Sequence, residues 1–213
     1  MKKTRLIFVV FALLLGLLWA FRAPLKQLAY DQLTRDMFVA GDSDSFDPGP
    51  LPGSAFPGVN ATWQGRQIRL LDEFAGPSGT LLVAARSVAW CPFCMRQLVQ
   101  LQAHKAAYDA AGIALVAITY DDPEVQRAFA AQWGIEYPIL HDVDTLTFRT
   151  LGILNRDYQP GDAAYGIPYP GMLVIDPAGK VVGKLFLEDY SVRVDAGAAL
   201  EFARAALAAP PGR

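Results

Sequence analysis

Residues 81–101 read LLVAARSVAWCPFCMRQLVQL and decide the fold, because a buried strand passes here into a long helix. The apolar run TLLVAA at residues 80–85 follows a Gly-Pro-Ser-Gly turn, which is typical of a buried strand. Residues 92–111 contain no glycine, are rich in Ala, Leu and Gln, and are followed by Gly112, which predicts a helix. The two cysteines of the chain therefore lie where a strand ends and a helix begins.

Strand and helix patterns alternate on both sides of this segment. Strands are predicted at residues 67–71, 113–119, 137–140, 172–175 and 180–186, and helices at 121–133, 145–151 and 195–208. The turn Asp176-Pro177-Ala178-Gly179 joins the last two strands as a hairpin. Strand–helix–strand units that end in a hairpin and a helix predict an α/β fold, with a central mixed β-sheet flanked by helices.

Composition narrows the class of protein. Of 213 residues, 53% are hydrophobic and 19% charged, which excludes a disordered chain. A net charge of -2 gives no basic surface for nucleic acid. Two cysteines exclude a disulfide-rich miniprotein and a four-cysteine metal or iron–sulfur site. We expect no cofactor and no metal.

The N-terminus carries the pattern of a membrane anchor. Lys2, Lys3 and Arg5 precede an apolar run over residues 6–21, which Arg22 closes. As a helix this run spans about 24 Å, against about 30 Å of bilayer hydrocarbon. A cleaved signal peptide has the same pattern, although no A-x-A site is present; a buried core helix is the third reading. Anchor and signal peptide both place the rest of the chain across the membrane, so we expect a single-pass inner-membrane protein with a periplasmic or extracytoplasmic domain.

The predicted organisation has three parts. Residues 1–22 form the membrane anchor or signal peptide, and residues 55–213 form the α/β domain. Between them, residues 24–40 have helical spacing and predict a juxtamembrane helix, which packs on the domain or binds a partner. Residues 41–58 are dominated by Gly, Pro, Ser and Asp and predict a linker, so residues 23–54 are assigned to helix and linker together.

The chemistry is carried by Cys91-Pro92-Phe93-Cys94. Two cysteines three residues apart on a first helical turn can bring their sulfurs within bridging distance. The helix N-terminus favours a thiolate, and Pro92 is tolerated there because a first-turn N–H has no helical acceptor. We therefore expect Cys91 to be the nucleophile and Cys94 the resolving cysteine of a redox-active pair. An inert disulfide or a metal site is the alternative, although His104 and His141 lack zinc-ligand spacing.

The segment at 81–101, with Trp90 before the first cysteine, resembles the active-site segment of thioredoxin-like proteins. YPILHDVD at 137–144 resembles a segment of the alkyl hydroperoxide reductase/thiol-specific antioxidant family, the peroxiredoxins. PGMLVIDPAGKVVGK at 170–184 resembles the cis-proline, strand and hairpin of that superfamily. The resemblance covers roughly residues 55–205. It implies a thioredoxin-like fold in which Pro170 is a cis-proline facing the dithiol.

Some positions depart from the peroxiredoxin pattern. Ala84 and Val88 stand where that family has Pro and Thr or Ser relative to the first cysteine, and no arginine counterpart is found around Pro170. Residues 155–169 form an insertion rich in Gly, Pro and Tyr, read as a surface loop or as a lid over the site.

Three functions follow from these patterns. The first is a membrane-tethered thiol–disulfide oxidoreductase that acts on a protein dithiol or disulfide. The second is a peroxiredoxin-like peroxidase in which peroxide oxidises Cys91 and Cys94 then forms the disulfide. The third is a non-catalytic tethered binding module. The expected catalytic residues are Cys91 and Cys94, and the expected substrate contacts are Trp90, Pro92, Phe93, Tyr169 and Pro170.

Overall fold

The computed structural model describes residue 30 and residues 32–209. The chain divides into two units, Met1–Asp36 and Met37–Arg213. The second unit therefore starts before residue 55, where the sequence places the beginning of the α/β domain. The expected anchor at residues 6–21 lies outside the described residues, and within those residues no helix is both long and apolar enough to cross a bilayer.

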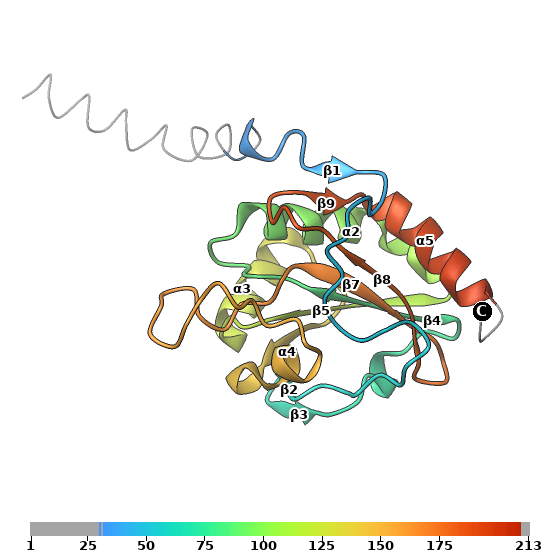
Figure 1. The fold of residues 1–213 in the computed structure, drawn as a ribbon, viewed down its shortest axis with the longest axis horizontal. Coiled ribbons are helices and arrows are strands. Elements are labelled where there is room, and N and C mark those ends of the chain that lie inside the picture. The colour runs from blue at the N-terminus through green and yellow to red at the C-terminus, as the bar shows by residue number, and fades with distance from the viewer. Residues whose placement is uncertain (1–29, 31, 210–213) are drawn as a thin grey trace, which may run out of the picture. The chain divides into compact units, whose positions relative to one another are not determined.

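A seven-stranded mixed sheet forms the centre of the second unit, in the order β3-β2-β6-β5-β4-β7-β8 (Figure 1). Its strands are β2 (Ala61–Trp63), β3 (Arg66–Ile68), β4 (Gly79–Ala84), β5 (Ile113–Thr119), β6 (Ile139–Asp142), β7 (Gly171–Ile175) and β8 (Val181–Phe186). The three central strands β4, β5 and β6 run parallel, and the outer pairs are antiparallel. This arrangement confirms the predicted α/β class.

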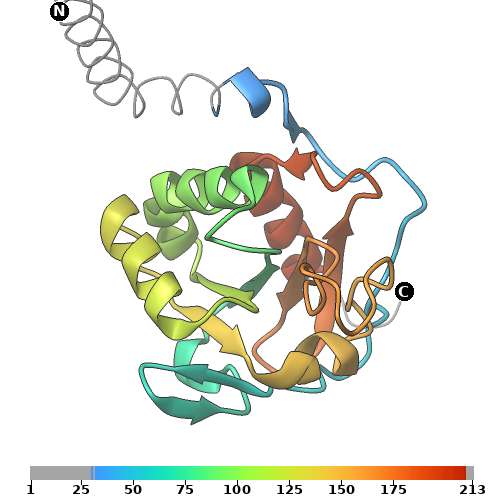
Figure 2. The same ribbon diagram turned by 90° about the vertical axis from the view of Figure 1, so that its left-hand side faces the viewer.

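Helices cover both faces of the sheet. They are α2 (Pro92–Ala110), α3 (Pro123–Trp133), α4 (Leu146–Thr150) and α5 (Ala196–Ala208), with short 3-10 turns at Asp72–Phe74 and Val143–Thr145. Figure 2 shows α2 and α5, in green and red, on one face, and α4, in ochre, on the other. Alternate residues of β4 serve the two faces: Leu81 and Val83 join one core cluster, and Leu82 joins the other. This alternation explains why the whole strand is apolar.

The longer predicted elements are present with small shifts of boundary. The strand predicted at 113–119 is β5, and the helix predicted to end at Trp133 is α3. Three short strands were not predicted: β1 (Phe38–Val39), β2 and β9 (Arg193–Val194). Residues 38–39 are extended rather than helical, because the backbone of β1 pairs in parallel with β9.

Residues 41–56, called the strap below, differ from the predicted linker because they are bound along the edge strand β8. The backbone amide of Phe186 donates to Asp42 Oδ2 over 3.1 Å, and Gly53 N donates to the carbonyl of Val181 over 2.7 Å. Between these points Lys184 Nζ lies 2.9 Å from Asp47 Oδ1. The strap thus covers a sheet edge whose N–H and C=O groups would otherwise be open to pairing with another chain.

Candidate active site

The dithiol lies at the predicted joint between strand and helix. Cys91 is the N-cap of α2, with φ -90° and ψ 100°, and Pro92 is the first helical residue. Cys91 is 1% exposed and Cys94 is fully buried. Both are free thiols in this structure, so the geometry is that of the reduced pair.

Hydrogen-bond donors gather on Cys94. Its Sγ accepts from the backbone N–H of Arg86 over 3.4 Å and from Arg193 Nη2 over 3.3 Å. Cys91 Sγ accepts from the backbone N–H of Cys94 over 3.3 Å. A guanidinium contact is charge-assisted and stronger than a contact to a neutral amide, so the arrangement favours negative charge on Cys94.

The two thiols are shifted in opposite directions. Burial alone would raise the pKa of Cys94, but a hydrogen bond from the Cys91 thiol, the Arg193 charge and backbone N–H groups outweigh it and lower that pKa. The hydrogen bond that Cys91 gives to Cys94, together with burial, raises the pKa of Cys91. Both shifts favour a thiolate at Cys94 with a protonated Cys91 beside it.

This arrangement departs from the role predicted for Cys91. From the sequence the thiolate is expected at Cys91, because a helix N-terminus stabilises negative charge. In the structure a full cation lies beside Cys94, and a cation in a dry site outweighs the partial charge of a helix end. We therefore assign the stabilised thiolate to Cys94.

Arg193 is the functional residue that the sequence analysis missed. It lies in β9, 99 residues after Cys94, and is 2% exposed. Its Nη1 donates to the carbonyls of Tyr190 and Val192, and its Nε has no partner. No carboxylate forms an ion pair with Arg193 within the described part of the chain. Because a buried cation requires a counter-charge, the Cys94 thiolate is the group that fits.

A buried carboxylate shapes the loop before the dithiol. Asp121, 8% exposed, accepts from Ser87 Oγ and from the backbone N–H of Val88, each over 2.7 Å. Ser87 Oγ accepts in turn from the backbone N–H groups of Ala89 and Trp90. This network fixes residues 86–90, including the Arg86 amide that contacts Cys94.

Next to the dithiol, the side chains of Trp90, Phe93 and Tyr190 form an aromatic surface, and the Arg86 guanidinium contacts two of its rings. The Arg86 guanidinium lies 5.2 Å from the Trp90 ring and 4.5 Å from the Tyr190 ring. The Phe93 and Tyr190 rings meet edge to face, with centroids 6.2 Å apart. Trp90 remains 43% exposed. The predicted contact residues Trp90 and Phe93 thus lie together at the surface, and their binding of substrate stays a prediction, as does that of Pro92 inside the turn.

Pro170 lies near the site, but its predicted cis bond is wrong. None of the described peptide bonds is cis, so the Tyr169–Pro170 bond is trans. Pro170 directly precedes β7, where a proline costs no ladder hydrogen bond. Pro170 and Tyr169 line a pocket of about 150 Å³ with Arg86 and with Asn155, Asp157 and Tyr158 of the insertion. The insertion therefore lines a pocket beside the site, which is where a lid would have to lie.

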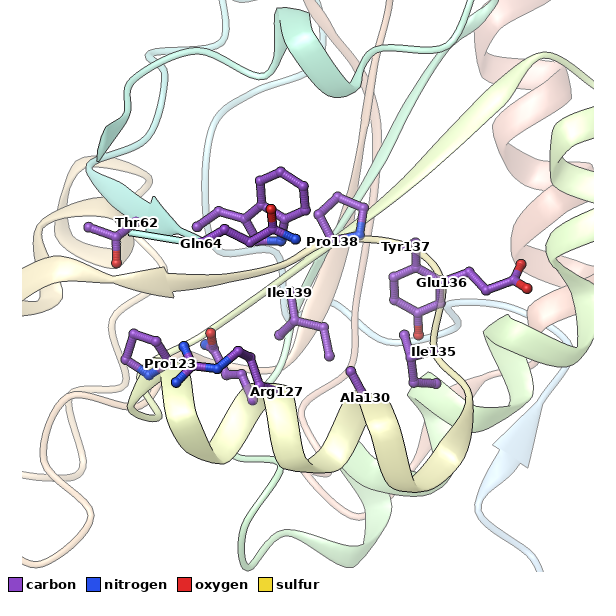
Figure 3. A pocket seen from close by; sticks show the side chains of 12 residues that line it. Thr62, Gln64, Pro123, Arg127, Ala130, Ile135, Glu136, Tyr137, Pro138 and Ile139 are labelled. Carbon is purple, nitrogen blue, oxygen red and sulfur yellow. The ribbon is translucent and has the colours of Figure 1, made fainter. Parts of the chain in front are cut away.

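A separate hollow of about 160 Å³ lies between α3 and the β2–β3 hairpin (Figure 3). Figure 3 shows Pro123, Arg127 and Ala130 on the helix side, and Thr62, Gln64 and Pro138 opposite them. None of the predicted site residues lines it. The reacting groups therefore do not open into this hollow.

Residues 52–184 match the AhpC/TSA family. Among characterised proteins, alkyl hydroperoxide reductase E of Mycobacterium bovis and of Mycobacterium tuberculosis is 27% identical over 127 residues, which is 60% of this chain and 79% of the relative.

Solved structures of similar fold include reduced Prx3 of Vibrio vulnificus in complex with H2O2. It has a TM-score of 0.62 and 20% identity, and the likeness covers 72% of this chain and 99% of that one. A peroxiredoxin-like protein of Aquifex aeolicus has a TM-score of 0.59 and 15% identity, with 77% and 90% covered. At these identities the likeness shows the fold, which is the predicted thioredoxin-like one.

Proposed function

The chain belongs to the AhpC/TSA family, and from that premise we propose that it is a thiol-dependent peroxidase whose reacting group is the Cys94 thiolate. The observation that carries the proposal is the 3.3 Å contact between the buried Arg193 guanidinium and Cys94 Sγ. A thiolate, not a thiol, attacks peroxide, and the contact stabilises that form.

The chemistry takes two steps. The Cys94 thiolate attacks the terminal oxygen of a hydroperoxide; the O–O bond breaks, a proton goes to the leaving alkoxide, and sulfenic acid and alcohol (water from H2O2) are formed. The Cys91 thiol then attacks the sulfenic sulfur, releasing water and forming the Cys91–Cys94 disulfide. An external dithiol reduces this disulfide and completes the cycle.

Burial favours a small oxidant. Cys94 has no exposed surface and Cys91 is 1% exposed. A hydroperoxide is small enough to reach a sulfur through local opening, whereas a disulfide of a folded partner is not. The peroxidase reading therefore needs less rearrangement of the reduced protein than protein–disulfide exchange does.

A second candidate keeps the thiol–disulfide exchange role, with Cys91 as the attacking sulfur. It is favoured by the surface beside the dithiol, where Trp90 and Tyr190 are 43% and 55% exposed. Exposed aromatic rings are frequent anchors for protein partners. A binding module without chemistry would have no use for a stabilised thiolate, so we set that reading aside.

Three proteins separate the two candidates: wild type, Cys91→Ser and Cys94→Ser. A peroxidase acting through Cys94 consumes H2O2 rapidly in wild type. Cys91→Ser completes one turnover and stops at a sulfenic acid that dimedone traps, and Cys94→Ser reacts no faster than free cysteine. An exchange enzyme acting through Cys91 instead reduces insulin disulfides, and its Cys94→Ser variant accumulates mixed disulfides. Slow peroxide consumption by wild type would reject the peroxidase.

We also propose that residues 6–21 tether the enzyme to the inner membrane, with the domain on the extracytoplasmic side. The support is the apolar run and its flanking Lys and Arg residues. A tethered chain resists alkaline carbonate extraction, and added protease digests its domain in spheroplasts. Full release by carbonate, or protection from protease, would reject the tether or its orientation.

A further inference from the structure

The short strand β1 belongs to a sheet separate from the seven-stranded one. It forms a two-stranded parallel sheet with β9 (Figure 1), in which Phe38 is in register with Arg193 and Val39 with Val194. Neither strand pairs with any other described strand. β9 therefore depends on β1 for its β-type hydrogen bonds.

Arg193 connects this small sheet to the dithiol. Its backbone N–H donates to the Met37 carbonyl over 2.7 Å, while its Nη2 donates to Cys94 Sγ over 3.3 Å. Two residues on, the backbone N–H of Asp195 donates to the Val39 carbonyl over 2.8 Å. The residue that supplies the cation is thus held by its own main chain to the segment that begins the second unit.

Hydrogen bonds to Gln100 also hold this part of the chain, but they involve Asp195 and Ala196, which follow Arg193. Asp195 caps α5 and accepts from Gln100 Nε2 over 2.6 Å, and the backbone N–H of Ala196 donates to Gln100 Oε1 over 3.0 Å. On the preceding side, residues 187–192 form a loop. A long arginine side chain loses rotamer entropy when it is fixed, so its backbone must be held firmly for the guanidinium to stay on the sulfur.

We propose that Met37–Val39 is a positioning segment of the active site: it holds β9 so that the Arg193 guanidinium stays on Cys94. Met37 is 3% exposed, and the half-buried Val39 packs against the core cluster that contains both cysteines. Both Met37–Val39 and Arg193 lie outside residues 52–184, the part that matches the AhpC/TSA family.

The inference rests on the proposed role of the Cys94 thiolate, but its test needs no peroxide. The titratable or charged side chains acting on that thiol are Cys91 and Arg193, and Asp189 is close enough to Arg193 for the two charges to interact. The Arg86 side chain points to Trp90 and Tyr190. Displacing Arg193 thus removes the one cation in contact with Cys94 among the described residues.

The test compares two proline substitutions in the full chain. In a strand, the N–H and C=O of one residue point to the same side. Because the Val39 carbonyl faces β9, Val39→Pro removes an N–H on that side, whereas Phe38→Pro removes one that faces away. Both are made in a Cys91→Ser background, where Cys94 is the sole thiol, and iodoacetamide alkylation is followed against pH.

We expect Val39→Pro to raise the midpoint of the alkylation profile by about one pH unit or more, which slows alkylation about tenfold at a pH below both midpoints, with little change for Phe38→Pro. The double variant Val39→Pro/Arg193→Met should react no more slowly than Arg193→Met alone, since both substitutions remove the same contact.

If Val39→Pro fails to fold, Val39→Gly gives a weaker effect in the same direction. Equal midpoints in the two proline variants, or full additivity with Arg193→Met, would overturn the proposal, whether or not the protein reduces peroxide.

Discussion

Two buried arginines flank the dithiol and act on it through different atoms. Arg193 contacts Cys94 Sγ with its guanidinium, whereas Arg86 contacts the same sulfur with its backbone N–H. The Arg86 guanidinium lies between the Trp90 and Tyr190 rings. Substitution of the two side chains should therefore have different effects on the thiol, although both residues lie beside it.

We predict that Arg193→Met raises the pKa of Cys94 by at least about one unit, equivalent to about 1.4 kcal/mol. At about pH 4, below both pKa values, the thiolate fraction and with it the rate of peroxide consumption then fall about tenfold, whereas at pH 7 the thiolate stays the main form. Arg86→Met, which keeps the backbone N–H, is the matched control and should shift the pKa much less. Absorbance of the thiolate near 240 nm against pH measures both. Equal shifts in the two variants would show that the Nη2 contact has no special role.

The pH dependence of the first oxidation step follows from the direction of the Cys94 shift. Because the pKa of this thiol is lowered, the thiolate is already the main form at neutral pH. The second-order rate constant with H2O2 should therefore stay nearly constant from about pH 7 to 8.5 and fall only in acid. A thiol with the ordinary pKa of about 8.5 would gain about tenfold per pH unit up to that value. Stopped-flow fluorescence over this range distinguishes the two profiles, and a tenfold rise would contradict the assignment.

At the scale of elements, the strap replaces the missing neighbour of β8. Lys184 is the central contact: its side chain is 4% exposed, and besides Asp47 Oδ1 it reaches the carbonyls of Asp47 and Pro48. A lysine in the middle of a covered strand is costly unless its ammonium is satisfied. The strap and the lysine therefore stabilise each other.

We predict that Asp47→Ala lowers the free energy of unfolding by about 1–2 kcal/mol, since one charge of the pair is buried while Asp47 itself is 59% exposed. The matched control is Asp109→Ala, which removes a helix-surface pair with Lys105 worth about 0.5 kcal/mol. Urea denaturation measures both. If Asp47→Ala costs no more than Asp109→Ala, the strap is held by its backbone contacts alone.

At the scale of the whole molecule, the redox state should change stability. In the reduced protein the Arg193 guanidinium is balanced by the Cys94 thiolate, whereas a Cys91–Cys94 disulfide carries no charge and would leave the buried cation unbalanced. So small a disulfide loop adds little by chain entropy. Oxidation should therefore destabilise this protein.

We predict that the oxidised form melts at a lower temperature than the reduced form at pH 7. A thiol pKa lowered in the folded state contributes about 1.4 kcal/mol per unit, and 1 kcal/mol shifts Tm by about 2–4 °C in a chain of this size. This contribution is fully present above about pH 8.5, the unfolded thiol pKa, and is lost as pH falls through the lowered folded value. The difference in Tm should therefore shrink in acid, and it should also shrink in Arg193→Met. Calorimetry of both forms tests this, and a more stable oxidised form would contradict it.

The sequence alone determined the elements that carry their own signals. The apolar runs that become β4 and β5 and the caps that bound α2 and α3 are local patterns, and the α/β class follows from their order. The Cys91–Cys94 pair at the start of α2 was also predictable, because spacing and helix position are local properties. The dithiol and its place at the start of α2 were thus predictable from the chain itself.

The contact that favours a thiolate at Cys94 exists only in the folded chain. Arg193 lies 99 residues from Cys94 in sequence, in a two-residue strand with no periodicity to detect. The strap reads as a linker, because Gly, Pro and Asp give the same local signal whether or not their backbone pairs with a distant strand. A helix end favours a thiolate at Cys91, but a guanidinium placed by the fold favours Cys94, and a full charge in a dry site dominates. Only the folded chain brings that charge to the sulfur.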